Sequence, residues 1–307
     1  MKPHIVVIGS SNTDMIIQAP RIPAPGQTVL GGRFSTAAGG KGANQAVAAA
    51  RAGAQVTLVA RVGDDAFGRQ ALAGFERDHV DTRFVVRDEQ APSGVASIIV
   101  DDHGQNAIAV APGANANLSP QDVARAAKTI ASADAVLLQL EIPLDTVQAA
   151  VDVAHEHKVR VILNPAPACG LSDEVLRGVD VLTPNEIEAG MLTGSEVVDE
   201  ADAARAAALL RDRGAGTVIV TMGPRGAIVD GPDQRGPIAA FAVEAVDTTA
   251  AGDVFNGALA VALAEGRPLP DACRWACAAA ALSVQCLGAQ PSAPTRVAIE
   301  RFLVDRP

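Results

Sequence analysis

Aromatic residues are scarce in this sequence of 307 residues, which has no tyrosine, one tryptophan and seven phenylalanines. A site that stacks a free nucleobase needs an aromatic platform, so this scarcity argues against a nucleoside as the substrate. Runs of lysine or arginine are also absent, and the formal net charge is −10 with a pI near 5.0. This balance argues against nucleic acid and membrane as partners, although local donors can still bind an anionic ligand.

Cysteine is equally sparse, and no CxxC pair occurs. The four cysteines are Cys169, Cys273, Cys277 and Cys286. Cys273 and Cys277 are one helical turn apart, but no further cysteine or histidine is near enough in sequence to complete a zinc site. The N-terminal apolar run is too short for a signal peptide or a membrane span. We expect reduced, mostly structural thiols in a cytoplasmic protein.

From Leu118 onward, near-continuous apolar strands alternate regularly with helices. The expected strands are 135–141, 159–164, 179–185 and 217–223, following strands near 4–9 and 56–62. This alternation is typical of an α/β fold with a doubly wound, mostly parallel central sheet and helices on both faces. We expect residues 1–307 to form a single domain.

A second group of extended segments interrupts this pattern. Val95–Val100 and Asn106–Val110 flank a loop containing Gly104, as in a β-hairpin. Together with extended segments at 15–19 and 29–34, they predict a small β-sheet lid inserted within about 14–35 and 94–112. An uncovered apolar lid face is unfavourable in a monomer, so we expect a homodimer formed through the lid.

The stretch Asp247–Gly257 combines a predicted helix N-terminus with an acidic residue in its first turn. Apolar Phe241–Val246 predicts a strand before it, and the small and apolar residues from Val254 to Ala264 predict a buried helix after it. The amides of Ala250, Ala251 and Gly252 would then be free at a helix N-terminus and could bind an anion. Asp253 is either a helix cap or a base that accepts a proton from an attacking hydroxyl.

A second glycine-rich turn, Ala38–Gln45, precedes an Ala-rich helix. It lacks the GxxxxGK[ST] pattern of a P-loop, because Ser35 occupies the first glycine position. Glycines permit close backbone approach, and Asn44 can both donate and accept hydrogen bonds, which suits a polyhydroxylated ligand. Asn12 and Asp14 follow the first strand and are candidates to contact the same ligand, or are ordinary turn residues.

Polar residues also end the later strands, at Glu141, Asn164, Asn185 and Thr221. The carboxyl ends of parallel strands meet at one crevice, so these residues should converge. Asn185 and Glu188 could hold phosphate and Mg²⁺, or could simply cap an exposed helix. The loop Gly288–Ser292 either ligates a monovalent cation or only stops the preceding helix.

Taken together, these segments resemble the ribokinase-like family of carbohydrate kinases, over residues 4 to about 303. Four signatures carry the resemblance, with support from Asn164–Ala168 and Gly288–Ser292: Gly9–Asp14, Gly39–Asn44, Asn185–Glu188 and Asp247–Asp253. The resemblance implies transfer of the γ-phosphate of ATP to the 5-hydroxyl of D-ribose, with Mg²⁺ and an activating K⁺.

The resemblance also implies a role for individual residues. Asp253 would be the catalytic base, and the amides of Ala250, Ala251, Gly252 and Asp253 the anion hole. Sugar contacts would come from Asn12, Asp14, Gly40, Lys41, Asn44 and Glu141. Nucleotide contacts would come from Asn185, Thr221, Gly223, Arg225, Gly226, Gly252 and Cys277, with Glu188 near Mg²⁺. The K⁺ site would comprise Asp247, Thr249, Ser283, Cys286, Gly288 and Ser292.

One position departs from the family pattern. Relatives often have a histidine or asparagine beside the adenine where this chain has Cys277, and a thiol forms weaker hydrogen bonds. The alternatives are a kinase for another pentose, for deoxyribose or for a nucleoside, and a sugar-binding homologue without catalysis. A non-catalytic homologue would be expected to have lost the base or the metal motif, yet Asp253, Asn185 and Glu188 are all present.

Overall fold

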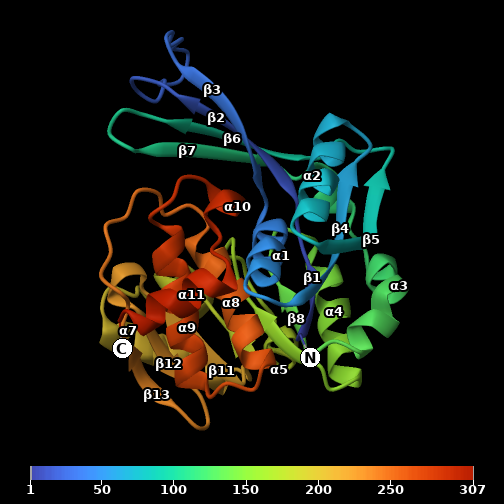
Figure 1. The fold of residues 1–307 in the computed structure, drawn as a ribbon, viewed down its shortest axis with the longest axis vertical. Helices are drawn as coiled ribbons and strands as arrows, with labels where there is room; N and C mark the ends of the chain where they lie inside the picture. Colours follow the sequence, from blue (N-terminus) through green and yellow to red (C-terminus); the bar gives the residue numbers. More distant parts are fainter. Residues whose placement is uncertain (1, 307) are drawn as a thin grey trace.

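A twisted central sheet organises the computed structural model, which describes residues 2–306 (Figure 1). Its nine strands have the order β13-β12-β11-β10-β9-β8-β1-β4-β5, and β12 and β13 pair antiparallel at one edge of an otherwise parallel sheet. The strands are β1 His4–Ile8, β4 Gln55–Gly63, β5 Val80–Asp88, β8 Ala135–Leu138, β9 Arg160–Leu163, β10 Val181–Leu182, β11 Thr217–Thr221, β12 Ala227–Asp230 and β13 Arg235–Ile238.

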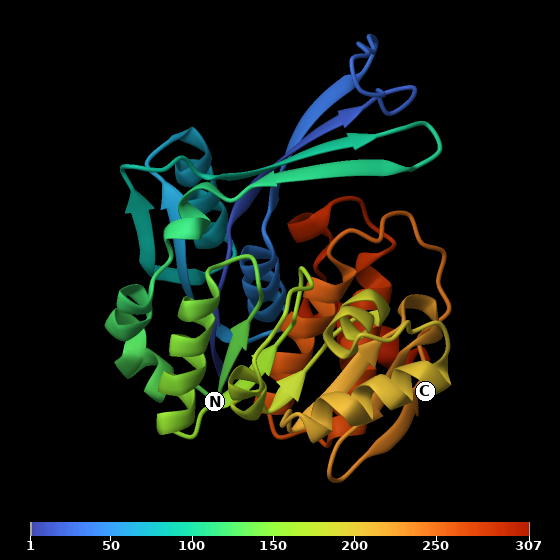
Figure 2. The same cartoon turned by 180° about the vertical axis from the view of Figure 1, so that it is seen from behind.

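Helices cover both faces of this sheet (Figures 1 and 2). One face packs against α1 Lys41–Arg51, α2 Ala66–Arg77, α8 Ala251–Ala264, α9 Leu269–Ser283 and α11 Arg296–Val304. The other packs against α3 Pro120–Ala131, α4 Leu144–Glu156, α5 Asp173–Arg177, α6 Glu186–Thr193 and α7 Glu200–Asp212. Along β1, Ile5 and Val7 enter the first core and Val6 and Ile8 the second, as the period-2 alternation of a strand requires.

Small residues bring α1 and α8 into close contact. A Cβ at Gly257 would lie 2.7 Å from the Cβ of Ala48, so a larger residue at either position would push the helices apart. This close packing places the N-termini of α1 and α8 side by side above the carboxyl edge of the sheet.

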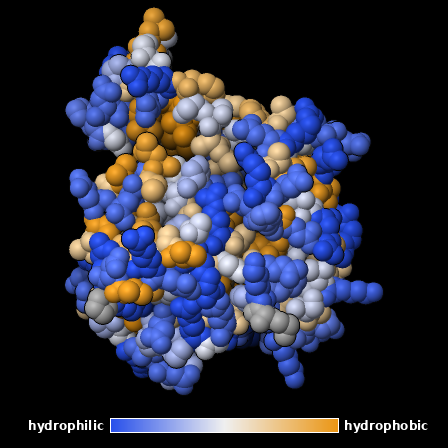
Figure 3. Space-filling view, viewed as in Figure 1, coloured by the Kyte–Doolittle hydropathy of each residue, from blue (hydrophilic) through white to orange (hydrophobic). Residues whose placement is uncertain are grey.

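A separate four-stranded sheet extends beyond the body as the lid (Figure 1). Its order is β3-β2-β6-β7, with β2 Asn12–Gln18, β3 Arg33–Gly39, β6 Gly94–Val100 and β7 Asn106–Ala111. All residues of β7 are exposed, and Figure 3 shows apolar surface where the lid overhangs the body. A short helix, α10 Ala289–Ser292, lies near β3, and η1 Gly113–Asn117 returns the chain from the lid.

The predicted fold class is confirmed, with three local corrections. Phe241–Val246 is not a strand, because Phe241 packs edge-on against Phe302, with 5.2 Å between ring centroids, instead of joining the sheet. The lid segment expected at 29–34 instead forms β3 over Arg33–Gly39, and the strand expected at 135–141 ends at Leu138. The sequence patterns also missed β5, β12 and β13. None of the helices within residues 2–306 is long and apolar enough to cross a membrane.

Candidate active site

The site lies where the connections of the central sheet change direction. From β1 the chain adds β4 and β5 on one side, whereas β8 and the later strands continue on the other side. Ligands of doubly wound folds bind at such a switch point, beyond the carboxyl ends of the strands. Here that edge carries Gly9–Asn12 after β1 and Gln139–Glu141 after β8.

Asp253 occupies the first turn of α8 and is buried, with 5 % of its surface exposed. Its Oδ2 accepts a hydrogen bond from Asn44 Nδ2 at 2.9 Å, and its Oδ1 accepts one from Gln45 Nε2 at 3.0 Å. Burial raises the pKa of Asp253, while the charge of Lys41 and these two hydrogen bonds oppose the rise. A buried carboxylate with a raised pKa is suited to accept a proton.

The turn before Asp253 presents backbone amides. Ala250 has φ 60° and ψ 14°, a left-handed conformation that is strained for alanine and concentrates at functional sites. No side chain of the described residues caps this helix, and a Cβ on Gly252 would meet open space. Because the Ala251 amide already donates to Thr248 O at 3.2 Å, the anion site depends chiefly on the amides of Gly252 and Asp253.

The N-terminus of α1 forms the opposite side of the site. Glu141 Oε2 accepts hydrogen bonds from Lys41 N at 3.0 Å and Ser10 Oγ at 2.5 Å. Gly40 has φ 89°, and a Cβ there would lie 2.6 Å from the backbone nitrogen of Asn12. This glycine therefore lets the turn approach the segment that carries Asn12 and Asp14.

The amides and the carboxyl group on this side differ in how they are held. Asn44 Oδ1 is buried and has no hydrogen-bond partner among the described residues, while Asn44 Nδ2 is used by Asp253. Asn12 Oδ1 accepts from Asn115 Nδ2 at 2.8 Å, which fixes the orientation of the Asn12 amide. Burial, together with the charges of Glu141 and Asp253, raises the pKa of Asp14 to about 6.

The two sides of Asp253 therefore have opposite hydrogen-bonding character. The α1 side offers the oxygens of Asp14, Asn44 and Glu141, which accept hydrogen bonds from hydroxyls. The α8 side offers amide donors at a helix N-terminus, which suit an anion. Lys41 lies between acidic groups: burial lowers its pKa, but Asp253, Glu141 and Glu188 together raise it above the ordinary value.

The candidate nucleotide and Mg²⁺ residues lie at α6 and after β11. Asn185 and Glu188 form a reciprocal cap, in which Glu188 Oε2 accepts from Asn185 N at 2.9 Å and Asn185 Oδ1 accepts from Glu188 N at 2.8 Å. Glu188 is nevertheless buried, and the charges of Lys41 and Asp253 influence its pKa, which burial raises. It is thus both the cap and an acid that faces the site.

The turn after β11 is held against α6. Asn185 forms a bridge with Thr221, and Gly223–Gly226 closes through Met222 N to Gly226 O at 2.8 Å. The guanidinium of Arg225 donates to Glu186 Oε1 at 3.0 Å and to Val198 O at 2.6 Å. Cys277 is buried on α9, and burial raises the pKa of its thiol to about 12, so it stays protonated.

The candidate cation residues lie on two segments that Asp247 joins. Its Oδ1 accepts from Thr249 N at 2.9 Å and its Oδ2 from Gly288 N at 2.8 Å. Cys286 is exposed, whereas Ser283 and Ser292 are buried and donate within their own helices, to Ala280 O and Ala289 O. Within residues 2–306 no cluster of three acidic, histidine or cysteine side chains is arranged for a metal. Any cation here would depend largely on backbone oxygens.

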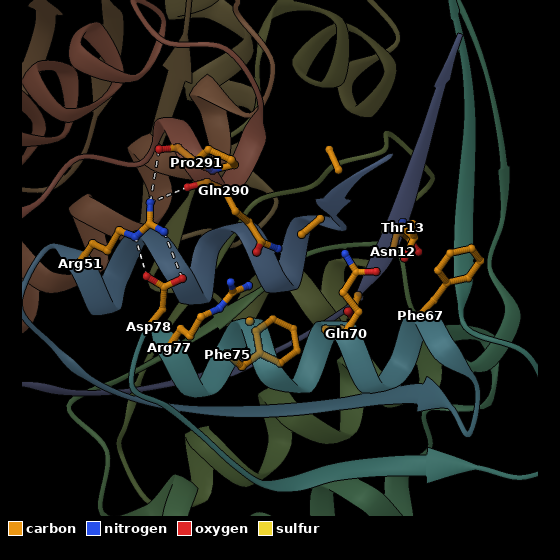
Figure 4. A pocket seen from close by; sticks show the side chains of 15 residues that line it. Asn12, Thr13, Arg51, Phe67, Gln70, Phe75, Arg77, Asp78, Gln290 and Pro291 are labelled. Carbon is orange, nitrogen blue, oxygen red and sulfur yellow. Dashed lines mark hydrogen bonds and ion pairs between the residues drawn. The ribbon is translucent and has the colours of Figure 1, made fainter. Parts of the chain in front are cut away.

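A cavity of about 340 Å³ lies between α1 and α2 beside this site (Figure 4). Arg51 spans one end of it, donating to both carboxylate oxygens of Asp78 and to the carbonyl of Gln290 at 2.7 Å. Of the candidate sugar contacts only Asn12 lines the cavity. Arg51 therefore fastens α10, and with it the candidate cation loop, to α1 and α2.

Sequence reasoning missed some of the groups that hold the site together. Asn115 lies 103 residues from Asn12, and Gln139 lies 94 residues from Gln45, so no local sequence motif could predict these contacts. Gln45 stands inside the glycine-rich motif, but its contact with Asp253 depends on the packing of α1 against α8. The one available signal was that Gln139 is a polar residue near the end of the predicted strand 135–141.

Comparison with known proteins agrees with this geometry. The family model for pfkB family carbohydrate kinases matches residues 2–296. The chain belongs to this family. The resemblance expected from the four sequence signatures is thereby confirmed.

Individual relatives of this pfkB-family chain cover nearly its whole length. A ribokinase from Haemophilus influenzae is 44% identical over 303 residues, covering 99% of both chains. A deoxyribokinase from Salmonella typhi is 40% identical, covering 97% of both chains. The solved structure of Arabidopsis thaliana ribokinase complexed with ribose and ATP has a TM-score of 0.90 and 33% identity, covering 99% of both chains.

Proposed function

We propose that this chain is a ribokinase, which transfers the γ-phosphate of ATP to the 5-hydroxyl of D-ribose and releases D-ribose 5-phosphate and ADP. The observation that carries the proposal is the opposite character of the two sides of Asp253. Hydroxyl-binding oxygens lie on the α1 side and anion-binding amides on the α8 side. A base between a polyol site and a phosphate site is what phosphoryl transfer to a sugar hydroxyl requires.

In this proposal Asp14, Asn44 and Glu141 accept hydrogen bonds from ribose hydroxyls. The fixed Asn12 amide donates to the sugar, and Gly40 and Lys41 complete the contacts. Asp253 accepts the proton of the 5-hydroxyl as its oxygen attacks the phosphorus. The amides of Gly252 and Asp253, at the turn formed by Ala250 and Ala251, stabilise the charge of the transferred phosphoryl group.

The nucleotide would lie along α8, α6 and the turn after β11. Asn185, Thr221, Gly223, Arg225, Gly226, Gly252 and Cys277 are the proposed contacts. Glu188 would hold Mg²⁺ through the acceptor positions that its cap leaves free, and the bound ion would neutralise phosphate charge. Asp247, Thr249, Ser283, Cys286, Gly288 and Ser292 would surround K⁺, chiefly with backbone oxygens.

The remaining parts of the proposal concern organisation. We take residues 1–307 as one kinase domain with the lid inserted, and we propose a homodimer that covers apolar lid residues such as Phe34 and Ile108, which are 65% and 57% exposed. The cysteines, all free in the structure, are consistent with a cytoplasmic location.

The test is ADP release, coupled to a reporter enzyme, with a panel of D-ribose, 2-deoxy-D-ribose, other pentoses and nucleosides. We expect the highest kcat/KM with D-ribose. Deoxyribose is the second candidate, because a deoxyribokinase is 40% identical to this chain. A higher kcat/KM with deoxyribose would replace the proposed substrate, and sugar binding without ADP release would indicate a non-catalytic homologue.

A further inference from the structure

A buried chain of side-chain amides lies behind Asp253 and has no role in the assignments above. Gln45 is fully buried, and its Nε2 donates to Asp253 Oδ1 at 3.0 Å and to Asn164 Oδ1 at 3.1 Å. Its Oε1 accepts from Gln139 Nε2 at 2.6 Å. Both N–H groups and the oxygen of the Gln45 amide are therefore engaged with three fixed partners.

The direction of every hydrogen bond in this series of side-chain amides is set by one backbone carbonyl, that of Thr183. Thr183 O can only accept, so Asn164 must present its Nδ2 there, at 3.0 Å. Asn164 Oδ1 then faces Gln45 and requires a donor from it. Gln45 consequently presents its NH₂ group to Asp253 and cannot turn its oxygen towards the carboxylate without breaking bonds on both sides.

We propose that Gln45 is the positioning residue for the base, holding Asp253 in one orientation and favouring its ionised form. The inference depends on the proposed function, in which Asp253 accepts the proton of the sugar hydroxyl. Asn44 holds the second carboxylate oxygen at 2.9 Å, but its free Oδ1 is a candidate sugar contact. Gln45 also donates to Asp253 but is not a candidate sugar contact. Its hydrogen bond to the carboxylate should therefore be the same before and after the sugar binds.

The charged groups around Asp253 make this donor important. Asp14 on β2, Glu141 after β8 and Glu188 on α6 are acidic, and the positive charge of Lys41 on α1 opposes them. Burial and the acidic neighbours favour the protonated carboxyl, which cannot act as a base. A donor to the charged form opposes this tendency.

The experiment measures kcat and KM for ribose against pH in wild type and in Gln45→Met. Methionine conserves the length of the side chain but donates no hydrogen bond. We expect the acid limb of the kcat profile to move upward by about one pH unit, the size expected for losing one charge-assisted hydrogen bond. The kcat should therefore be roughly tenfold lower on the acid side and should recover at alkaline pH, with a small change in KM.

Gln139→Met is the matched control, because Gln139 is buried in the same chain but does not touch Asp253. It should lower the melting temperature by an amount similar to Gln45→Met without moving the acid limb. An unmoved limb in Gln45→Met, or an equal movement in Gln139→Met, would overturn the proposal in favour of a structural role.

A second readout separates this inference from the proposed function. The infrared carbonyl band of the protonated Asp253 carboxyl, identified by its loss in Asp253→Asn, can be titrated in the sugar-free protein. We expect its midpoint to be higher in Gln45→Met than in wild type. Equal midpoints would overturn the role of Gln45 even if ribose is phosphorylated, whereas a shifted midpoint would support it even if another sugar is the substrate.

Discussion

The body and the lid differ in how completely their strands are buried. Residues Ile5 to Ile8 of β1 are fully buried, whereas every residue of β7 is exposed and Leu30, in the connection between β2 and β3, is 86% exposed. A buried strand end holds a side chain at a fixed position, because any displacement disturbs two packed cores. A strand covered on neither face can move as a unit. The body thus holds the candidate catalytic residues in fixed positions, whereas the outer lid is restrained by fewer packing contacts.

The candidate residues are divided along the same boundary. Asn44, Gln45 and Asp253 belong to body helices, while Asn12 and Asp14 stand at the start of β2, where the body becomes the lid. We therefore expect changes in the body to reduce turnover, changes at the junction to weaken sugar binding, and changes in the outer lid to affect assembly.

The largest effect should come from Asp253→Asn, at the centre of the body. The amide preserves shape but cannot accept the proton of the hydroxyl, so kcat should fall by roughly 10²–10⁴-fold. Calorimetric titration should show ribose binding close to that of wild type. Near-wild-type turnover in the purified variant would mean that Asp253 is only a helix cap.

At the junction, Asp14→Ala should mainly weaken ribose binding. It would leave sugar hydroxyls without an acceptor, at a cost of roughly 1–3 kcal/mol of binding free energy. Because the pKa of Asp14 is raised to about 6, wild-type affinity should also fall as the pH drops below about 6, where the carboxylate is lost. Calorimetry at several pH values measures both effects, and an unchanged affinity at neutral pH would locate the sugar elsewhere.

The same raised pKa of Asp14 predicts that folding stability changes with pH in the direction opposite to ribose affinity. A carboxyl whose folded pKa is raised from 3.8 to about 6 makes folding less favourable as the pH rises through that window. Asp14→Asn should therefore raise the melting temperature at pH 7.5, and this advantage should disappear below about pH 4. A variant that is less stable than wild type at pH 7.5 would contradict the electrostatic argument.

Local patterns predicted the body better than the lid or the connections between distant segments. The Asn185–Glu188 cap and the Asp253 helix start are written within a few residues, so the sequence could reveal them. The strand expected at Phe241–Val246 has the right apolar pattern, but Phe241 packs on α11 instead of pairing with a strand. β5 was missed because its pattern mixes charged and apolar residues at a sheet edge, where one side stays open.

A smaller effect is expected from potassium, which would act on the body beside the anion site. Asp247 ties the two loops together through its carboxylate, so a cation at their backbone oxygens would orient the turn that carries the Gly252 amide. Initial rates should be higher in potassium than in a large inert cation at constant ionic strength, with little change in KM for ribose. Equal rates in the two salts would remove the cation site.

A substitution at Arg51 can test whether the loop at α10 must be held in place for potassium to act. Arg51→Gln would release α10 from Asp78 and should raise the potassium concentration needed for half-maximal rate, because the loop would no longer be held in place. Arg69→Gln is the control, because Arg69 lies on α2 and forms no ion pair within residues 2–306. It should leave that concentration unchanged.

The smallest effect on turnover should come from the outer lid. Phe34→Glu and Ile108→Glu would each place a charge on a different face of the sheet. Phe34 pairs with Ile17, which pairs with Ile99, whereas Ile108 pairs with the adjacent Ile98. If the lid joins two copies, Phe34→Glu combined with Ile108→Glu should reduce the mass measured by light scattering from twice the chain mass to 31.2 kDa. Leu209→Glu, at an exposed position of α7 in the body, controls for the added charge and should leave the mass unchanged. The chemistry depends on body residues that neither substitution touches, so kcat should change far less than in Asp253→Asn. A wild-type protein that is already a monomer at working concentration would refute the lid interface, and a double variant with kcat as low as Asp253→Asn would refute the division between body and lid.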